Sequence, residues 1–325
     1  MINREEHQTI LDVAVKYYLE DKTQSEIAKE LFISRSTVSR ILKKARENRI
    51  VDITINYQSE EFEILQKQIQ QLFNIENVHI TKTVKDETGT LKEVAKVAAK
   101  ELGLYLHNDI TLGISWGRHI GMTAKYLPQY DYKNIRIVEL FGAMTLSKSF
   151  ANTLSVGRKI CDKLNATLYP LPAPIYIFDP LWREEVMNSQ IVKNAFEKID
   201  ECDMIVTSIG AVETDCLQTL WHNYLQDDMR QEVIKHHGVG FILAHFFDYR
   251  GKFIDSSINN SVIGIETTKI CEKRIFAIAS GTKKVDAILG ALRGGFLHTL
   301  VSDEKTLRKV VEKALKQTKN SKYKW

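Results

Sequence analysis

The chain has 325 residues, which is long for one domain and suits a small module together with a larger one. Its 45 basic and 41 acidic residues leave a net charge of only +4, which excludes a general polyanion binder. No apolar run approaches the roughly 20 residues that span a bilayer, and the charged first residues do not resemble a signal peptide. We therefore expect a soluble, cytoplasmic protein without a membrane partner.

The cysteines and histidines give no pattern of a metal site. The four cysteines, Cys161, Cys202, Cys216 and Cys271, are far apart and form no C-x-x-C motif, so we interpret them as small core residues in a reducing compartment. His236, His237 and His245 lack a carboxylate at metal-ligand spacing. We predict neither a metal nor a cofactor.

The first predicted element is a helix from about Arg4 to Glu20. Its apolar stripe supplies the third helix that a helix-turn-helix needs to bury its apolar side. Thr23 and Glu26 then form a capping box that starts a second helix, and Ser34 can cap a third. In the third helix an inward face follows the i, i+3, i+4, i+7 rule and consists of Val38, Ile41, Leu42 and Ala45.

The opposite side of the third helix is polar and basic. Residues 22–49 contain eight basic and three acidic residues, a net charge of +5 that exceeds that of the whole chain. Short hydroxyls suit phosphate contacts and arginine suits the guanine edge in a major groove. We predict that double-stranded operator DNA contacts Gln24, Ser34, Arg35, Ser36, Thr37, Ser39, Arg40 and Lys43. The alternative is a surface helical hairpin with a solvated basic face.

One position departs from the helix-turn-helix pattern. Phe32 stands in the turn where glycine is usual, so either its φ is negative or the turn carries strain. After the third helix, Ile50 to Ile55 alternates like a short strand.

A helix from Ser59 to Phe73 follows, with an apolar seam at 3–4–3 spacing formed by Phe62, Leu65, Ile69 and Leu72. This seam could pair two chains, or the helix could pack on the neighbouring domain of its own chain. We predict a DNA-binding domain over residues 1–56, a linker helix over 57–74 and an effector domain over 75–325.

From about Ile75 strands and helices alternate. Strands are predicted at 78–80, 110–114, 135–141, 166–169, 204–209, 240–246 and 275–279, with 297–301 as a last apolar segment. Helices are predicted at 91–107, 117–127, 150–164, 180–199, 285–292 and 304–317. Continuous apolar strands separated by amphipathic helices indicate a parallel sheet covered on both faces, a Rossmann-like α/β fold.

Over nearly its full length the sequence resembles the SorC family of bacterial sugar-responsive transcription regulators. The resemblance rests on five segments: QSEIAKELFISRSTVSRILKKARENRIVDITI at 24–55, LGISWGRHIG at 112–121, LPAPIY at 171–176, HHGVGFILAHFFDYRG at 236–251 and ASGTKKVDAILGALRGG at 279–295. It implies an effector domain similar to phosphosugar isomerases and lactonases, and assembly as dimers of dimers.

Ligands of open parallel sheets bind beyond the carboxyl ends of the strands, where helix amino termini hold anions. The clearest candidate is the loop after Ile114, formed by Ser115, Trp116, Gly117, Arg118 and His119. Gly117 allows close approach to the backbone and Arg118 adds charge. Family members often carry threonine where this chain has His119, and a protonated His119 could pair with phosphate. The alternative is a structural turn without a ligand.

Further strand ends should converge on the same edge. Gly142 and Gly210 follow apolar strands, and Gly281 opens a second anion nest before a helix. The resemblance favours Lys284 over Lys283 as its cation. Asp248 could accept hydrogen bonds from sugar hydroxyls, or could be an Asx-type turn residue.

The sequence therefore predicts a transcriptional regulator of a carbohydrate operon, controlled by a phosphorylated sugar or sugar alcohol and assembled as a homodimer or homotetramer. An isomerase or lactonase fused to a DNA-binding module is the alternative. Its proton shuttle would need a positioned acid, for which Glu213 and Asp215 are available, but no active-site motif surrounds them. We predict no catalytic residues. A constitutive architectural DNA binder is a third possibility.

Overall fold

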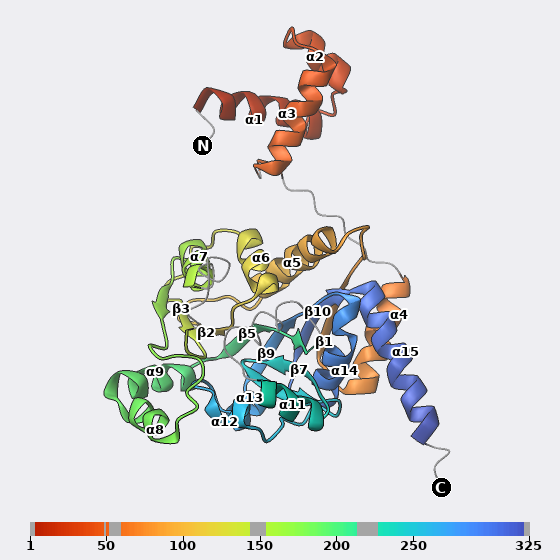
Figure 1. Ribbon diagram of the computed structural model, residues 1–325. Coiled ribbons are helices and arrows are strands. Elements are labelled where there is room, and N and C mark those ends of the chain that lie inside the picture. Colours follow the sequence, from red (N-terminus) through yellow and green to blue (C-terminus); the bar gives the residue numbers. More distant parts are fainter. Residues whose placement is uncertain (1–3, 49, 52–59, 144–153, 213–226, 322–325) are drawn as a thin grey trace. The chain divides into compact units, whose positions relative to one another are not determined.

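The computed structural model describes the chain except for residues 1–3, 49, 52–59, 144–153, 213–226 and 322–325 (Figure 1). It divides into two compact units, Met1–Asn56 and Tyr57–Trp325, which are taken in turn. The division falls at the predicted end of the DNA-binding domain. None of the helices in the described ranges combines the length and apolar character that crossing a membrane requires.

The first unit is a bundle of three helices, α1 (Arg4–Tyr18), α2 (Gln24–Glu30) and α3 (Arg35–Glu47). Their apolar stripes meet in a small core formed by Val13, Ile27, Ala28, Val38 and Leu42. The predicted strand at 50–55 is not seen in Ile50 and Val51, which form a bend that packs on α1 and α3. The rest of that prediction lies outside the described residues.

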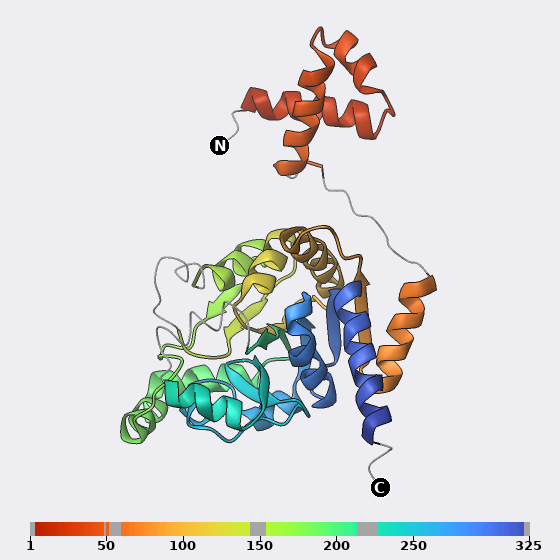
Figure 2. The same ribbon diagram turned by 45° about the vertical axis from the view of Figure 1, so that its right-hand side comes forward.

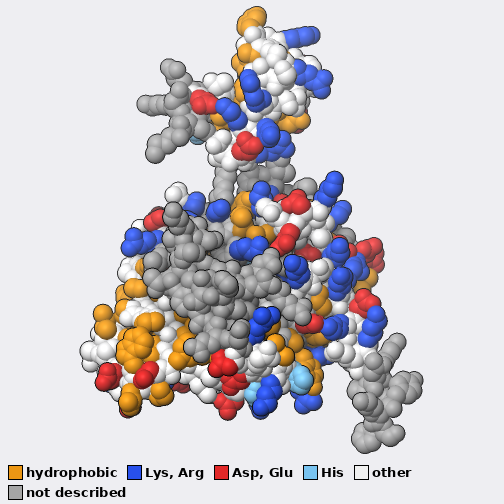
Figure 3. Space-filling view, viewed as in Figure 1, with side chains coloured by type: hydrophobic (Ala, Val, Ile, Leu, Met, Phe, Trp, Pro, Cys, Tyr) orange, Lys and Arg blue, Asp and Glu red, His pale blue; other side chains and the backbone are white. Residues whose placement is uncertain are grey.

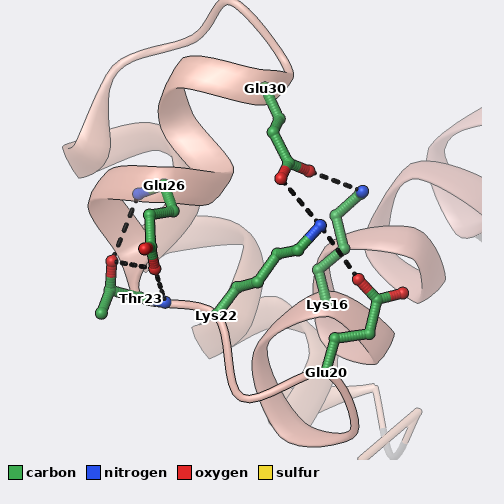
Figure 4. A network of polar contacts seen from close by, with 6 residues as sticks. All are labelled: Lys16, Glu20, Lys22, Thr23, Glu26 and Glu30. Carbon is green, nitrogen blue, oxygen red and sulfur yellow. Dashed lines mark hydrogen bonds and ion pairs between the residues drawn. The ribbon is translucent and has the colours of Figure 1, made fainter.

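The start of α2 is fixed by polar contacts (Figure 4). The Thr23 hydroxyl accepts from the Glu26 amide at 3.3 Å and the Glu26 carboxylate accepts from the Thr23 amide at 2.8 Å, which is the predicted capping box. Lys22 pairs with Glu30 at 2.7 Å and with Glu20 at 3.1 Å, and these two partners raise the pKa of Lys22. The ion pairs are exposed and therefore add little stability, but they hold the α1–α2 corner in place.

The second unit is built on a seven-stranded sheet in which every pair of neighbours is parallel. This confirms the predicted parallel α/β fold. The strands in spatial order are β1 (Asn77–Thr81), β10 (Thr299–Asp303), β9 (Arg274–Ile278), β5 (Met204–Ser208), β2 (Thr111–Ile114), β3 (Arg136–Glu139) and β4 (Thr167–Tyr169).

Helices cover both faces of this sheet because successive side chains of each strand point to opposite faces. In β9, Ile275 and Ala277 join one apolar core while Phe276 and Ile278 join the other. The second core is closed by α5 (Glu87–Gly103), α6 (Arg118–Tyr126) and α7 (Leu154–Leu164). The first is closed mainly by α4 (Glu60–Phe73), α9 (Gln190–Asp200), α13 (Thr267–Glu272), α14 (Val285–Arg293) and α15 (Glu304–Ser321).

The apolar seam of α4 packs within its own domain. Phe62, Leu65 and Ile69 are buried in the core that also holds Leu307 and Val310 of α15. Figures 1 and 2 both show α4 and α15 side by side. Of the two interpretations of the seam, packing on the neighbouring domain is the one that these contacts support.

Two predicted elements of the second unit are wrong in detail. The single helix at 180–199 is two helices, α8 (Pro180–Asn188) and α9, because Ser189 between them has an extended backbone with ψ of 139°. The single strand at 240–246 is a hairpin of β7 (Gly238–Ile242) and β8 (His245–Asp248), with β6 (Gly210–Ala211) beside β7 in a separate antiparallel sheet.

The turn of this hairpin has no sequence signal, which explains why a single strand was predicted. Its two loop residues, Leu243 and Ala244, have φ of 51° and 70°, the positive values that a two-residue turn of type I′ requires. The Asn-Gly or Asp-Gly pair that usually signals this turn is absent, and the apolar run continues through it. Two shorter helices, α11 (Asp227–Lys235) and α12 (Ser257–Ser261), pack near this sheet.

Candidate DNA-binding face and effector site

The third helix presents two faces. Val38, Leu42 and Ala45 are buried, whereas the side chains predicted to face DNA, Ser36, Ser39, Arg40 and Lys43, are exposed. Lysine and arginine side chains stand out from the surface of this unit in Figure 3. The helix therefore offers hydroxyls and cations to solvent on the side opposite its packing face, as a recognition helix must.

The amino end of α3 is organised by Ser34. Its hydroxyl accepts from the Thr37 amide at 3.1 Å and lies 2.7 Å from the Ser36 hydroxyl and 2.8 Å from the Thr37 hydroxyl. Ser34 thus has a capping role besides the predicted contact with DNA. Arg35 is exposed beside it, and Gln24 is half-buried at the first position of α2.

The turn between α2 and α3 carries the strain that glycine would have avoided. Phe32 has φ of 54° and its side chain is 96% exposed. A residue with a Cβ pays about 1 kcal/mol or more in this left-handed conformation. The exposed ring makes no packing contact that could explain the choice of phenylalanine.

In the second unit the order of the strands defines a topological switch point beside β2. The chain runs from β2 outward to β3 and β4, and then crosses back to β5 on the other side of β2. Ligands of doubly wound sheets bind at such a switch point, beyond the carboxyl ends of the strands. The loops after β2 and β5, which contain most of the predicted effector residues, meet there.

The loop after β2 is held close to the end of β5. The Ser115 amide donates to the Val206 carbonyl at 3.1 Å, and the Ser115 hydroxyl lies 3.0 Å from that of Thr207. Gly117 has φ of 145°, and a Cβ at this position would lie 2.9 Å from the Ser208 hydroxyl oxygen. The sequence of this loop therefore needs glycine for both backbone conformation and space.

Helix α6 begins directly after Gly117, and no side chain among the described residues caps its amino end. Its first-turn amides and helix dipole therefore favour an anion at this position. The Arg118 side chain does not turn into the loop, because it is exposed and pairs with Glu87 at 3.3 Å. Trp116 packs edge to face against Phe141, with ring centroids 5.6 Å apart.

His119 is buried and neutral, so the predicted ion pair between its side chain and a phosphate is corrected. The Ser280 amide donates to its Nε2 at 3.1 Å, and an amide can only donate, so Nε2 carries no proton. Burial, with Lys284 and Arg118 nearby, holds the pKa of His119 well below its usual range. The imidazole instead ties the loop after β2 to the loop after β9.

The predicted second anion nest is partly used by the protein itself. The Gly281 amide donates to the Asp303 carboxylate and to the Thr306 hydroxyl, both at 3.0 Å. Lys284 Nζ donates to the Ile209 carbonyl at 2.6 Å, at the end of β5. Lys284 therefore brings a cation to the switch point, while the Gly281 amide is directed elsewhere.

Asp303 is a residue that the sequence analysis missed. It is only 1% exposed at the carboxyl end of β10, and its carboxylate accepts from the Thr83 and Thr306 hydroxyls at 2.8 and 2.6 Å. It thereby joins the ends of β1, β9 and β10. An aspartate that ends an apolar strand and starts a helix was the available signal.

The other two glycines serve packing. A Cβ at Gly142 would lie 2.4 Å from the carbonyl oxygens of Ala173 and Pro174, and one at Gly210 would lie 2.0 Å from the Phe241 ring.

Asp248 lies in β8, and its carboxylate accepts from the Arg250 and Lys252 amides at 2.8 and 3.0 Å. These bonds describe the Asx-type turn, which was the alternative interpretation of Asp248.

Two small cavities of about 30 Å³ each adjoin Ser115 and Trp116 at the switch point. One also touches Gly142 and Glu139, and the other touches Tyr176 and Ser208. Glu139 was not predicted, although it ends strand β3. Burial raises the pKa of its carboxyl group.

A helix-turn-helix unit joined to a parallel α/β domain is the arrangement of a ligand-responsive transcriptional regulator. Comparison with known proteins identifies the family. Residues 58–312 match the family described as "Putative sugar-binding domain", and residues 5–48 match region 4 of sigma-70 factors. The chain belongs to the SorC family and is a sugar-responsive transcriptional regulator.

Full-length relatives support this assignment. The sorbitol operon regulator of Klebsiella pneumoniae is 30% identical over 316 residues, which cover 94% of this chain and 98% of the relative. The deoxyribonucleoside regulator of Bacillus subtilis is 25% identical over 95% of this chain and 99% of the relative. The crystal structure of full-length SorC from Klebsiella pneumoniae superimposes with a TM-score of 0.77 at 27% identity, covering 95% of this chain and all of that one.

Proposed function

We propose that the effector is a phosphorylated sugar or sugar alcohol whose phosphate binds at the amino end of α6. The observation that carries this proposal is the uncapped helix terminus behind Gly117 at the switch point of the sheet. Two features support it: backbone amides bind phosphate oxygens without a competing side chain, and Lys284 supplies a positive charge from the loop after β9. The proposed effector residues fall into two groups. Ser115, Trp116, Gly117 and Lys284 would contact the ligand, whereas Arg118, His119, Gly142, Gly210, Asp248 and Gly281, which are bonded or packed within the protein, would shape the site around it.

Binding at this edge must rearrange its side chains. Each cavity of about 30 Å³ holds little more than a water molecule, whereas a sugar phosphate needs several times that volume. Trp116 borders both cavities, and Lys284 already donates to the Ile209 carbonyl. A ligand that replaces these contacts binds one arrangement of the domain better than the other, which is what a sensor requires.

The same proposal assigns the exposed face of α3 to the major groove of an operator half-site, with Arg40 at a base edge. One recognition helix covers one half-site, so a two-fold related operator calls for at least a homodimer. Hydrophobic side chains also gather over α8 and α9 on the face shown in Figure 3. Among the apolar residues of these two helices, Leu181, Trp182 and Ile191 are 74%, 51% and 64% exposed. A patch of this kind supports self-association.

The names of the relatives favour a regulator that senses sugars without transforming them. One relative is named a sorbitol operon regulator and another a deoxyribonucleoside regulator, and neither name gives a reaction. Glu213 and Asp215, the acids considered for proton transfer, lie outside the described residues. A turnover assay with phosphorylated sugars tests this part, because steady product formation by the purified chain would establish an enzyme.

Thermal unfolding of the full chain with a panel of sugar phosphates and inorganic phosphate tests the effector site. We expect the cognate compound to raise the melting temperature and to change operator affinity in a gel-shift assay at fixed salt. Lys284→Ala should weaken both effects, whereas Lys283→Ala, which removes the exposed neighbouring cation, should leave them unchanged. Equal loss in the two variants, or no loss in either, would remove Lys284 from the site.

A further inference from the structure

A larger cavity lies away from the sheet edge, between β8, α12 and α13. Its volume is about 590 Å³, and it shares no lining residue with the two cavities at the switch point. Its polar lining includes Arg183, His245, Asp255, Asn260, Glu266 and Thr267. His245 lines this cavity, whereas its chain neighbours Ala244 and Phe246 line one of the cavities at the switch point. Its volume lies in the usual range of small-molecule sites.

Two buried atoms in this lining have no hydrogen-bond partner among the described residues: Nδ1 of His245 and Nε of Arg183. His245 is 5% exposed, and its Nε2 lies 2.9 Å from the Ile265 carbonyl oxygen. A carbonyl only accepts, so Nε2 carries the proton and Nδ1 presents a lone pair. Arg183 donates from Nη2 to the Val262 carbonyl at 3.3 Å, which leaves the Nε–H as a donor. The pair therefore offers one acceptor and one donor.

The charges around the pair decide what could satisfy it. Burial, opposed by the hydrogen bond to the Ile265 carbonyl and aided by the positive charge of Arg183, lowers the pKa of His245 to about 4, so the imidazole is neutral near pH 7. Asp255 and Glu266 line the same cavity, and Asn260 Nδ2 donates to the Asp255 carboxylate at 3.0 Å. A phosphate or carboxylate would meet these two negative residues and the Nδ1 lone pair, and Arg183 is the one cation among the lining residues that would oppose this repulsion. An apolar ligand would leave both buried atoms unsatisfied, which costs free energy for each.

We propose that this cavity is a second ligand site, for an uncharged polyhydroxy compound such as a free sugar or sugar alcohol. A hydroxyl group donates and accepts at once, so one hydroxyl satisfies Nδ1 of His245 and another the Nε–H of Arg183. Further hydroxyls donate to Asp255 and Glu266, and the ring of Phe253 covers part of the wall for carbon-bound hydrogens. The site thus selects against the phosphate that the edge of the sheet favours.

Titration calorimetry of the full chain with xylitol, mannitol and myo-inositol tests the proposal. We expect at least one polyol to bind, and His245→Phe, which removes the acceptor at similar size, to weaken that binding at least tenfold. His245→Gln keeps a polar side chain and should retain part of the affinity. His236→Phe alters an exposed histidine and should change nothing. Absence of binding by all three polyols at millimolar concentration, or full binding by a folded His245→Phe variant, would overturn the proposal.

A second pair of variants separates this site from the one at the sheet edge. Lys284→Ala should leave polyol binding unchanged, because Lys284 does not line the larger cavity. Asp255→Asn should weaken polyol binding and leave the response to a phosphorylated sugar intact. If Lys284→Ala abolished polyol binding as well, the polyol would be occupying the edge site and a separate second site would be wrong, while the proposed phosphate site would stand.

Discussion

The two units of the chain differ in whether their predicted binding groups are already bonded within the protein. On α3 the side chains of Ser39 and Arg40 are exposed, and the contacts that shape the face are made within a few residues. At the edge of the sheet the corresponding groups are already engaged over long distances in the sequence, as in the bond from Lys284 to the Ile209 carbonyl. The predicted DNA-binding face is therefore preformed, whereas a ligand at the proposed effector site would have to replace internal contacts.

This difference has a functional meaning. A preformed basic face binds without rearrangement, and its affinity is set by electrostatics and groove contacts. A site whose groups are already bonded binds a ligand only by breaking those bonds, and this links occupancy to the shape of the domain. His119 shows the point most directly, because it joins the loops after β2 and β9 through Ser280. Variants that separate the two units test the comparison.

The largest effect is expected from Arg40→Ala. The guanidinium is exposed on the outer face of α3, so under the proposed assignment its loss would remove a base contact worth about 1–3 kcal/mol and a charge that attracts phosphates. We expect specific operator binding in a gel-shift assay to be lost, while the melting temperature of the second unit and its response to sugar phosphates stay unchanged. Tryptophan fluorescence monitors the second unit selectively, since all four tryptophans lie in it.

Arg230→Ala provides the matched control, because it removes an exposed arginine from the second unit. Retention of specific binding by Arg40→Ala would remove α3 from its assigned role. A parallel loss in both variants would instead indicate non-specific electrostatic binding.

The next effect is the response to acid, which should differ between the units. Burial lowers the pKa of His245 from its ordinary value near 6.5 to about 4, so its neutral form stabilises the fold. This contribution is complete above pH 6.5 and is lost as the pH falls through 6.5 toward 4; it amounts to roughly 3 kcal/mol in all and about 2 kcal/mol by pH 5. His119, whose pKa is also lowered, acts in the same direction. The first unit has one histidine, His7, which is exposed.

Denaturant unfolding followed by tryptophan fluorescence at pH 7 and pH 5 measures the acid response of the second unit. The wild-type chain should lose stability between the two values, and His245→Gln should lose about 2 kcal/mol less, whatever its stability at pH 7. An equal pH dependence in the two proteins would show that His245 is not held neutral by the fold.

The same contrast explains how much could be predicted from the sequence. Three predicted features depend on residues that are close together in the chain, and all three are found in the structure. They are the capping box at Thr23, the inward positions of Val38 and Leu42, and the alternation of strands and helices that builds the parallel sheet. The hairpin at Leu243–Ala244 was missed because a turn with positive φ in two residues with a Cβ leaves no compositional signal.

The effector site shows the other limit. Gly281 follows a strand and opens a helix, as an anion nest does, but its amide is taken by Asp303, 22 residues further along. Glu139 and Tyr176 reach the cavities only because their strands and loops lie beside Trp116 in space. Whether a polar group is available to a ligand depends on partners distant in sequence, which periodicity and motif spacing do not reveal.

A smaller effect is expected from Gly117→Ala at the start of α6. The added Cβ would lie 2.9 Å from the Ser208 hydroxyl oxygen at a φ of 145°, so the loop must shift. We expect the affinity for the active sugar phosphate to fall about tenfold, or roughly 1.4 kcal/mol, with operator binding by the ligand-free protein unchanged. Gly295→Ala is the matched control, because Gly295 also has positive φ, 70°, but no atom lies within 4 Å of the added Cβ. Unchanged affinity in Gly117→Ala would show that the ligand does not approach this backbone.

The smallest effect is expected from Phe32→Gly in the turn of the first unit. The substitution removes the cost of a Cβ at φ of 54° and loses no packing, because the ring is 96% exposed. The greater entropy of glycine in the unfolded chain offsets part of the gain, so we expect about 0.5–1 kcal/mol of added stability. Hydrogen exchange of the α3 amides measures it, since no tryptophan reports on this unit.

Leu19→Gly separates strain from exposure. Leu19 is also an exposed apolar residue of the first unit, at 77%, but its φ is not positive, so glycine there should only destabilise. Slower exchange in Phe32→Gly together with faster or equal exchange in Leu19→Gly would assign the gain to the turn. If Phe32→Gly also weakened operator binding, the strained turn would have a role in presenting α3 to DNA, and the first unit would share the sensor's dependence on a conformation held at a cost.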